Sequence, residues 1–235
     1  MLRNVLCILL MTASPLARAD VNQLRRGIES RYRGAKTLKA IFYERYSDGN
    51  GGIAAESGTV YFSRPGRMRW DYQSPQSKLF LVDGTNAWFY VPADQTASRA
   101  KMKESSDWRT PLALIAGKAD LSELCRNLDE VTPSSAADTD EASVAPGDSL
   151  LRCTPRDNPI DKTTGQPEKT PYVLLESDSD SYLVRVVIHQ AGNAETEFRF
   201  SKWAENIPIP EIEFHFQAPP GVSIVDEESL ANEIH

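Results

Sequence analysis

Residues 62–73 read Phe-Ser-Arg-Pro-Gly-Arg-Met-Arg-Trp-Asp-Tyr-Gln, and this stretch decides the fold. Arg64-Pro65-Gly66 separates two runs of strand-forming residues, because proline and glycine favour turns over strand interiors. After the turn, Met68, Trp70 and Tyr72 alternate strictly with Arg67, Arg69 and Asp71. Successive side chains of a strand point to opposite faces of its sheet, so this alternation predicts one apolar face and one polar face.

The remainder of the chain continues the pattern of short strands and tight turns. Asp48-Gly49-Asn50-Gly51-Gly52 and Asp83-Gly84 are typical of hairpin turns. Short strands joined in this way predict one antiparallel sheet of about ten strands that must curl. The predicted strands are 40–46, 53–63, 67–73, 77–82, 86–91, 94–103, 150–154, 172–177, 182–190, 194–203 and 211–217.

Three helical segments interrupt the strands. Behind the possible caps Asp20 and Asn22, apolar residues recur at helical spacing up to Tyr32. Thr110-Pro111 is a good helix start and Gly117 a stop, while 120–128 predicts one or two further turns. The polar segments 132–149 and 155–170 are interpreted as exposed loops rather than domain boundaries. The helices are expected to cover the apolar side of the sheet.

The first nineteen residues have the pattern of a cleavable signal peptide. A short basic start precedes the apolar run Val5–Met11, and Ala17-Arg18-Ala19 fits a small-x-small cleavage site. We therefore expect an exported chain in which residues 20–235 form a single domain. A formal charge of −7 argues against binding of nucleic acid, which requires a basic surface.

Two cysteines, Cys125 and Cys153, remain after removal of the signal peptide. An even number of cysteines in an exported protein predicts a disulfide between them. Its expected role is structural, worth roughly 3 kcal/mol by chain entropy. A redox role is less favoured, because no Cys-x-x-Cys arrangement is present.

Aromatic residues on the predicted strands have two possible roles. Periodicity alone favours core packing over the lining of a ligand cavity, but it does not decide between them. A strongly curved sheet covered by few short helices does leave a concave apolar space that those helices need not fill. The residues concerned are Phe42, Trp70, Tyr72, Trp88 and Tyr90.

Several segments together resemble the outer-membrane lipoprotein carrier family, LolA, in their order and spacing. Each segment alone is weak evidence, and the specificity lies in the series. They are Ser47-Asp48-Gly49-Asn50-Gly51, Gly58, residues 62–70, Leu81-Val82-Asp83-Gly84, Ala87-Trp88-Phe89-Tyr90-Val91-Pro92, residues 110–116 and Ala218-Pro219-Pro220-Gly221-Val222.

The resemblance implies a mainly β fold of the LolA/LolB type, an incomplete antiparallel barrel with a helical lid over a hydrophobic cavity. It implies a monomeric periplasmic chaperone of a Gram-negative bacterium. Such a chaperone takes acylated lipoproteins from an inner-membrane lipoprotein-releasing ABC transporter to an outer-membrane acceptor. The residues expected to line its acyl-chain cavity are Phe42, Val60, Phe62, Met68, Trp70, Tyr72, Leu81, Trp88, Tyr90, Leu112, Leu114 and Ile115.

In that family the arginine of the Arg-Pro motif bonds to backbone carbonyls of the lid, and the matching residue is Arg64. The alternative for Arg64 is a solvated residue before a turn. The chain departs from the family at Met68, where members carry phenylalanine. It departs again over 129–180, with two long loops and a cysteine pair, and the acidic tail after Gly221 does not establish an additional strand.

Other functions are less favoured by the sequence. No nucleophile elbow, metal-binding motif or cofactor motif is present, so we expect neither an enzyme nor a bound metal or cofactor. His215 is interpreted as a solvent-facing strand residue, and Asp178 and Asp180 as solvated turn residues. An outer-membrane barrel is disfavoured by charged outward positions such as Arg67 and Lys101. A periplasmic lipid- or lipoprotein-sensing module of the same fold stays open as an alternative.

Overall fold

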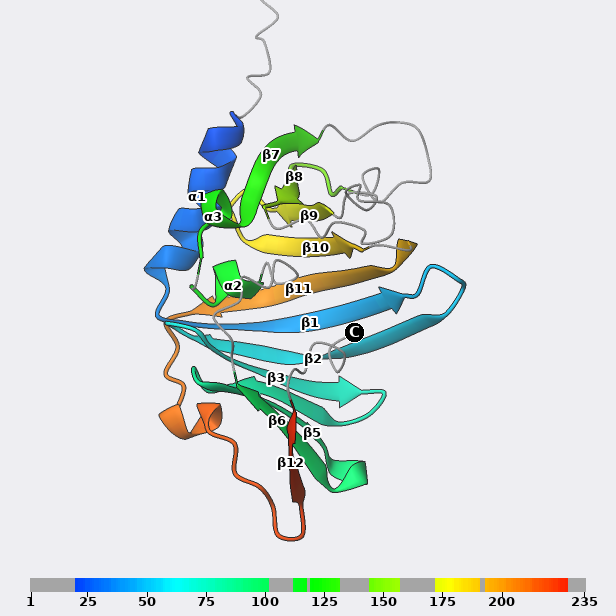
Figure 1. Ribbon diagram of the computed structural model, residues 1–235. Helices are drawn as coiled ribbons and strands as arrows, with labels where there is room; N and C mark the ends of the chain where they lie inside the picture. Colours follow the sequence, from blue (N-terminus) through cyan, green and yellow to red (C-terminus); the bar gives the residue numbers. More distant parts are fainter. Residues whose placement is uncertain are drawn as a thin grey trace, which may run out of the picture.

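The computed structural model describes residues 20–101, 112–117, 119–131, 144–156, 172–190 and 193–227. These residues form one sheet of twelve strands, in the order β12-β6-β5-β4-β3-β2-β1-β11-β10-β9-β8-β7. Figure 1 shows that the sheet is strongly curved. The strands are β1 (Thr37–Ser47), β2 (Ile53–Ser63), β3 (Arg67–Ser74), β4 (Lys78–Val82), β5 (Asn86–Val91), β6 (Thr96–Lys101), β7 (Cys125–Val131), β8 (Ser149–Pro155), β9 (Tyr172–Ser177), β10 (Leu183–His189), β11 (Glu195–Glu205) and β12 (Ser223–Glu227).

The helices are few and short apart from the first. They are α1 (Val21–Gly34), α2 (Leu112–Ile115) and α3 (Leu121–Leu124), with 3₁₀ turns η1 (Pro92–Asp94) and η4 (Glu211–Phe214). The Asp20 side chain caps α1 by accepting from the backbone N–H of Asn22 at 3.2 Å. In the described part of the chain, no helix combines the length and apolar character needed to cross a bilayer.

The predicted fold class is confirmed, because the described chain is mainly β and its single sheet is curved and open. Two details of the sheet differ from expectation. The sheet has twelve strands rather than about ten, and its pairing between β12 and β6 is parallel while the other pairings are antiparallel. The predicted signal peptide, Thr110-Pro111 and most of the two predicted loops lie outside the described residues.

The predicted strand at 211–217 is wrong. Glu211–Phe214 forms the turn η4, and the chain continues without strand pairing to β12. Both sides of β1 are already paired, with β2 and β11, so the centre of the sheet offers this segment no partner. Phe214 is instead buried against the convex face, where the guanidinium of Arg67 lies 5.7 Å from the centre of its ring. The alternating aromatic residues of 211–217 pack against the convex face of the sheet without forming a strand.

The predicted helical turns at 120–128 are wrong in part. Sequence spacing favours helix as far as Leu128, but the helix ends at Leu124 and β7 begins at Cys125. The disulfide between Cys125 and Cys153 is present, with the two Cα atoms 5.4 Å apart. It ties the start of β7 to its neighbour β8, and so fixes the outermost strand of the sheet.

The C-terminal strand β12 covers the other outer edge of the sheet. Asp226 accepts two hydrogen bonds from the guanidinium of Arg99, at 2.6 and 2.9 Å, and Glu227 accepts one from the hydroxyl of Ser98. The sequence did not establish this strand, because its acidic residues have low strand propensity.

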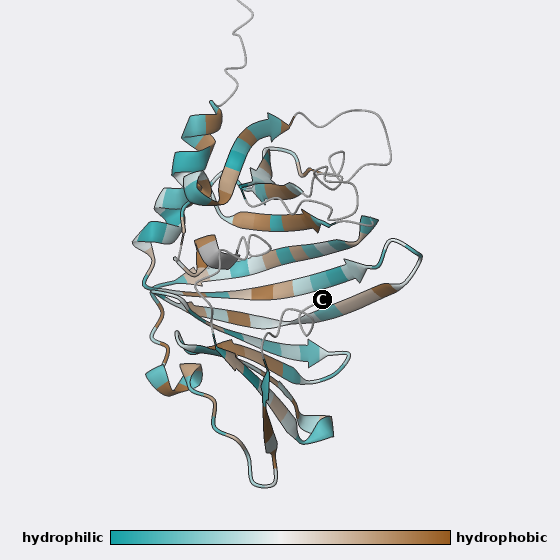
Figure 2. Cartoon of the chain, viewed as in Figure 1, coloured by the Kyte–Doolittle hydropathy of each residue, from teal (hydrophilic) through white to brown (hydrophobic). Residues whose placement is uncertain are grey.

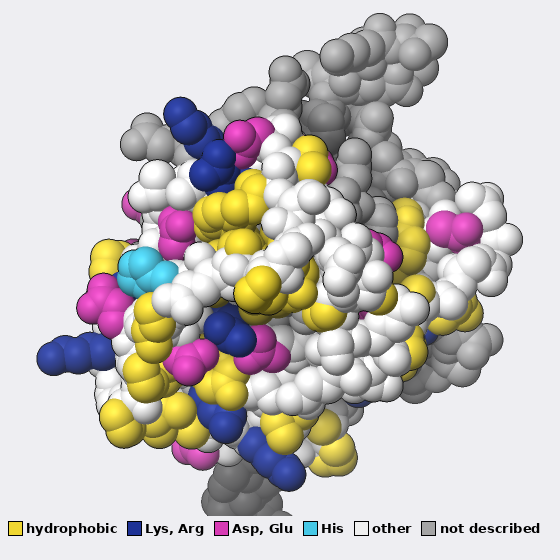
Figure 3. Space-filling view, turned by 90° about the horizontal axis from the view of Figure 1, so that it is seen from below, with side chains coloured by type: hydrophobic (Ala, Val, Ile, Leu, Met, Phe, Trp, Pro, Cys, Tyr) yellow, Lys and Arg dark blue, Asp and Glu magenta, His cyan; other side chains and the backbone are white. Residues whose placement is uncertain are grey.

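In Figure 3, which looks from below in the view of Figure 1, hydrophobic side chains are interspersed with basic and acidic ones.

The main hydrophobic core lies on the concave side of the sheet. It draws on α1 and on nearly all the strands, through residues such as Tyr32, Phe42, Trp70 and Leu183. A smaller apolar cluster of Leu150, Leu174 and Val187 lies on the opposite face of β8–β10. Figure 2 shows hydrophobic colours concentrated on the strands, while α1 is largely hydrophilic on the side in view. The concave side therefore carries the large apolar surface of the candidate site.

Gly58 allows the backbones of β2 and β3 to approach each other closely. A Cβ atom there would lie 2.0 Å from the carbonyl oxygen of Asp71 and 3.0 Å from the ring of Phe42, so Gly58→Ala forces the backbone apart. We expect a loss of about 2 kcal/mol in the free energy of unfolding, measured with urea. Gly34→Ala is the control, because a Cβ at Gly34 has no atom within 4 Å. Equal stability of the two variants would contradict this packing.

Candidate functional site

The concave face of β3 carries the three alternating apolar residues of the opening motif. Met68, Trp70 and Tyr72 are each at most 7% exposed and belong to the main core. Their neighbours across β2 are Phe62, Val60 and Gly58, in the same order. Residues opposite one another in paired strands share a face, so β2 and β3 together form one apolar wall. The predicted division into an apolar and a polar face is therefore confirmed for this hairpin.

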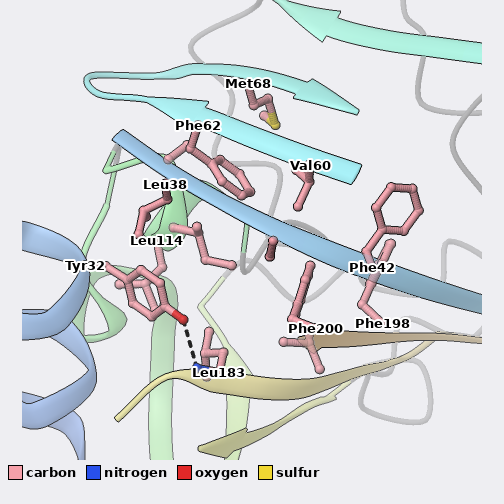
Figure 4. Close-up of a cluster of buried hydrophobic side chains, with 14 of the residues drawn as sticks. Tyr32, Leu38, Phe42, Val60, Phe62, Met68, Leu114, Leu183, Phe198 and Phe200 are labelled. Carbon is pink, nitrogen blue, oxygen red and sulfur yellow. Dashed lines mark hydrogen bonds between the residues drawn. The ribbon is translucent and has the colours of Figure 1, made fainter. Parts of the chain in front are cut away.

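Aromatic rings fill the middle of the concave face. The ring centre of Phe42 lies 4.7 Å from that of Trp70 and 4.9 Å from that of Tyr72, both edge to face. Phe198 and Phe200 also pack against Trp70, with ring centres 5.5 and 6.1 Å from that of Trp70. In Figure 4, Phe42, Phe198 and Phe200 lie close together. The structure thus brings residues from β1, β3 and β11 into one aromatic cluster.

The helix α2 covers the end of the concave face near α1. Leu114, Ile115 and Ala116 are each at most 2% exposed and belong to the same core. Figure 4 shows Leu114 beside Leu38, Phe62 and Tyr32. The backbone N–H of Leu183 donates to the hydroxyl oxygen of Tyr32 at 2.8 Å, which ties α1 to β10 beside this cover. Leu112 begins α2, and its side chain lies outside the described residues.

Three predicted cavity residues lie on the opposite, convex side. Leu81 pairs with Arg69 on one side and Trp88 on the other, so these residues share a face, and Tyr90 lies two residues beyond Trp88 on it. The concave positions of β4 and β5 are instead Phe80, Val82 and Ala87, together with Phe89, all of which are in or against the main core. The prediction that Leu81, Trp88 and Tyr90 line the cavity is wrong. Successive strand residues point to opposite faces, and the inward positions are those next to the predicted ones.

The convex residues have an aromatic partner that sequence reasoning missed. The ring of Phe216 stacks on Trp88 with centres 4.8 Å apart and lies 5.6 Å from the centre of Tyr90. The indole N–H of Trp88 donates to Asp83 at 3.1 Å. The alternation in 211–217 is the available signal in the sequence, but such alternation is equally typical of a strand. His215 is exposed as expected, although it lies outside any strand. Asp178 lies in a turn, and its side chain accepts a hydrogen bond from the backbone N–H of Tyr182.

Arg64 lies against the end of α2. A Cβ on Gly117, whose φ is +73°, would fall 1.9 Å from the Nε of Arg64, so the guanidinium occupies the space beside that glycine. The next turn residue, Gly66, donates its N–H to the carbonyl of Ala116 at 2.9 Å. Within the described chain, Nη1 of Arg64 is buried without a hydrogen-bond partner. Burial lowers the pKa of this guanidinium, and the charge of Asp120 opposes that shift.

A polar group adjoins the aromatic cluster at the other end of the concave face. Glu44, on β1, is 1% exposed and accepts a hydrogen bond of 2.9 Å from the hydroxyl of Tyr72. Lys78 pairs with Glu56 and lies 4.5 Å above the ring of Tyr72. Burial raises the pKa of Glu44 to about 8; the charge of Glu56 also raises it, and Tyr72 and Lys78 lower it. Neither Glu44 nor Lys78 was among the predicted site residues.

The concave space is occupied by side chains in this structure. Its aromatic and aliphatic residues are almost fully buried against one another and against α2. A hollow of about 370 Å³ occurs elsewhere, between α1 and the start of β10, and it is lined by polar residues that include Arg31, Asp180 and Glu205. The arrangement is therefore that of a closed apolar interior, with a short helix as part of its cover.

Known proteins that are similar in sequence are named as lipoprotein carriers. The family model "Outer membrane lipoprotein carrier protein LolA" matches residues 33–140. A protein of Nitrosospira multiformis named outer-membrane lipoprotein carrier protein is 26% identical over 203 residues, covering 85% of this chain and 87% of its own length. A protein of Dechloromonas aromatica with the same name is 28% identical over 198 residues, covering 83% and 84%.

A solved structure supports the fold. An uncharacterized conserved protein from Thermus thermophilus superposes with a TM-score of 0.51 at 9% identity, covering 88% of this chain and 98% of its own. At that identity the likeness concerns the fold alone. The sequence matches confirm the resemblance to the LolA family, and the matched relatives are named as carriers, not as enzymes.

The buried carboxyl group of Glu44 makes stability depend on pH. Its pKa is about 8 in the folded protein against an ordinary value of 4.5, so folding favours the protonated form. The free energy of unfolding should therefore fall as the pH rises from 5 to 8, on the order of 3 kcal/mol for this group. Urea unfolding at both pH values measures the slope, to which other groups also contribute.

Glu44→Gln isolates the part that belongs to this carboxyl. The amide is neutral at both pH values, so the variant should lose less stability than the wild type between pH 5 and pH 8. Tyr72, whose pKa is raised well above 10 by burial, does not titrate in this interval. Identical slopes for variant and wild type would show that Glu44 is already ionised in the folded protein.

Proposed function

We propose that the protein is a periplasmic chaperone that holds the acyl chains of lipoproteins on its concave face and carries them between membranes. Residues 1–19 then act as a cleaved signal peptide, and residues 20–235 form one carrier domain. The observation that carries the proposal is the large apolar cluster on a curved sheet, part of whose cover is a helix of four residues. The names of the matched relatives support it.

The physical need for such a carrier is large. Each methylene group removed from water is worth about 0.8 kcal/mol, so one chain of sixteen carbons contributes on the order of 12 kcal/mol. Free diffusion through water is therefore excluded for an acylated protein. A carrier must shield the acyl chains from water and still release them to an acceptor that shields them better.

The closed interior supplies a way to limit affinity. Acyl chains can reach the end of the concave wall under α2 only if Leu114, Ile115 and Ala116 withdraw, which exposes buried apolar surface and breaks the bond from Gly66 to Ala116. The free energy of closing is then subtracted from that of binding. The residues that would line the opened space are the concave ones, Phe42, Val60, Phe62, Met68, Trp70 and Tyr72, joined by Phe80, Val82 and Phe89.

The proposed partners are an inner-membrane ABC transporter that supplies lipoprotein and an outer-membrane acceptor that receives it. The sensing alternative is not favoured, because the matched relatives are named as carriers. The direct test incubates the purified protein with inner-membrane vesicles that contain the transporter and an acylated lipoprotein. Lipoprotein should enter the soluble fraction, bound to the protein, only when ATP is present. Lipoprotein that stays on the vesicles while the added protein remains folded would refute the proposal.

Arg64→Leu tests how the closed form is held. The substitution removes the guanidinium that lies beside Gly117 at the end of α2, so the open form should gain population. We expect the variant to retain lipoprotein and to pass it to outer-membrane vesicles several-fold more slowly than the wild type.

Arg67→Leu is the matched control for Arg64→Leu. Arg67 lies three residues away but faces the convex side, where it pairs with Glu211 at 2.8 Å. Its loss should leave the transfer rate unchanged, because a partly exposed ion pair of this kind contributes little. Equal transfer rates for Arg64→Leu and wild type would remove Arg64 from the closing mechanism.

A further inference from the structure

Two polar atoms in the concave apolar cluster lack partners. Among the described residues, Oε1 of Glu44 and Nε1 of Trp70 are buried and make no hydrogen bond. Both residues are 1% exposed, so water does not reach them in the closed form. Native proteins pair nearly all buried polar atoms, and each exception needs an explanation, such as a role in binding.

The two atoms belong to one local arrangement. Phe42 contacts both Trp70 and Tyr72, with ring centres 4.7 and 4.9 Å away, and Tyr72 bonds to Glu44. Glu44 lies two residues after Phe42 on β1 and therefore shares its face. The unpartnered atoms thus flank the same aromatic cluster, at the wall where acyl chains would lie.

The chemistry of the two atoms selects the kind of group that would pair with them. An indole N–H can only donate. Burial holds the pKa of Glu44 at about 8, so at neutral pH the carboxyl is mostly protonated. Its Oε2 accepts from Tyr72, which leaves the hydroxyl at Oε1 as a donor. Two donors in an apolar wall are complementary to acceptor oxygens that carry no hydrogen.

We propose that Glu44 and Trp70 form a binding site for the ester carbonyl groups of an acyl lipid, which they hold at the polar end of its chains. The inference rests on the proposed carrier function and adds a preference to it. A hydrocarbon would fill the same apolar space but leave both donors unpaired. An ether lacks the carbonyl oxygens that project from an ester, and keeps only linkage oxygens that lie within the chain and offer donors on the wall a less accessible acceptor. The protein should therefore discriminate between lipids of equal chain length by their linkage.

The test compares dipalmitoylglycerol with dihexadecylglycerol, which has ether linkages in place of esters. Both are radiolabelled and offered together in vesicles of a dialkyl phosphatidylcholine, and the ratio of the two lipids on the soluble protein is measured at pH 7. Wild type should favour the ester by about three- to tenfold, the effect of one net hydrogen bond or somewhat more. Trp70→Phe and Glu44→Leu should each bring the ratio toward one.

Two controls separate the donors from general effects on packing. Glu44→Gln keeps an N–H donor at the site and should keep the preference. Trp203→Phe removes an indole N–H that already donates to the carbonyl of Leu183 at 2.9 Å, so it should leave the ratio unchanged. If Glu44→Leu fails to fold, the comparison of Trp70→Phe with Trp203→Phe decides.

The outcomes distinguish this inference from the proposed function. If wild type takes up neither lipid but still takes up lipoprotein from the transporter vesicles with ATP, the carrier function stands and the ester site is overturned. If it takes up neither the lipids nor the lipoprotein, the carrier function fails, and the ester site fails with it. If wild type takes up both lipids equally, the carrier function stands and the ester site is overturned. A preference that persists in both Trp70→Phe and Glu44→Leu would also overturn the site.

Discussion

Competition for one apolar surface is the constraint on which the rest of the structure depends. A helix of four residues is too short to be stable by itself, so α2 is ordered by what its side chains bury. Leu114, Ile115 and Ala116 bury themselves against the concave wall of the sheet. In the proposed function an acyl chain needs this same surface, and the chain and α2 cannot occupy it together. Closing and loading would then oppose each other.

The interior also keeps polar atoms that a purely structural core would not. Nε1 of Trp70 lies in the middle of the wall and Oε1 of Glu44 near its far end. In the described residues neither atom has a hydrogen-bond partner. Such atoms make the closed form less stable than full pairing would. A closed form of limited stability suits the proposed carrier function, in which the interior has to open.

The strand period of two residues predicted most of the sheet and the inner face of its best-defined strand, β3. It placed Met68, Trp70 and Tyr72 correctly on the concave face, because the break at Arg64-Pro65-Gly66 fixes where β3 begins. It failed for Leu81, Trp88 and Tyr90, because both faces of β4 and β5 are apolar and periodicity does not then identify the inner one. The covering residue Phe216 is remote in sequence, and only the tertiary structure shows that it packs on Trp88.

Other features depend on long-range pairing that local patterns do not encode. Strand β12 is acidic and joins the sheet through Arg99 and Ser98, which lie more than a hundred residues away in the chain. Glu44 resembled an ordinary charged residue between Tyr43 and Arg45, and its burial follows from the curvature that brings Tyr72 over it. The sheet and the inner face of β1–β3 were thus predictable, while the polar atoms within that face were not.

Hydrogen exchange at two amides of one turn tests the central claim most directly. The N–H of Gly66 donates to Ala116 at the end of α2, whereas the N–H of Arg64 donates to Lys36 at the start of the sheet. If acyl chains displace α2, loading with lipid should speed exchange at Gly66 and leave Arg64 unchanged. Unchanged protection at Gly66 in the lipid-loaded protein would contradict the account, because the interior would then have accepted its cargo without opening.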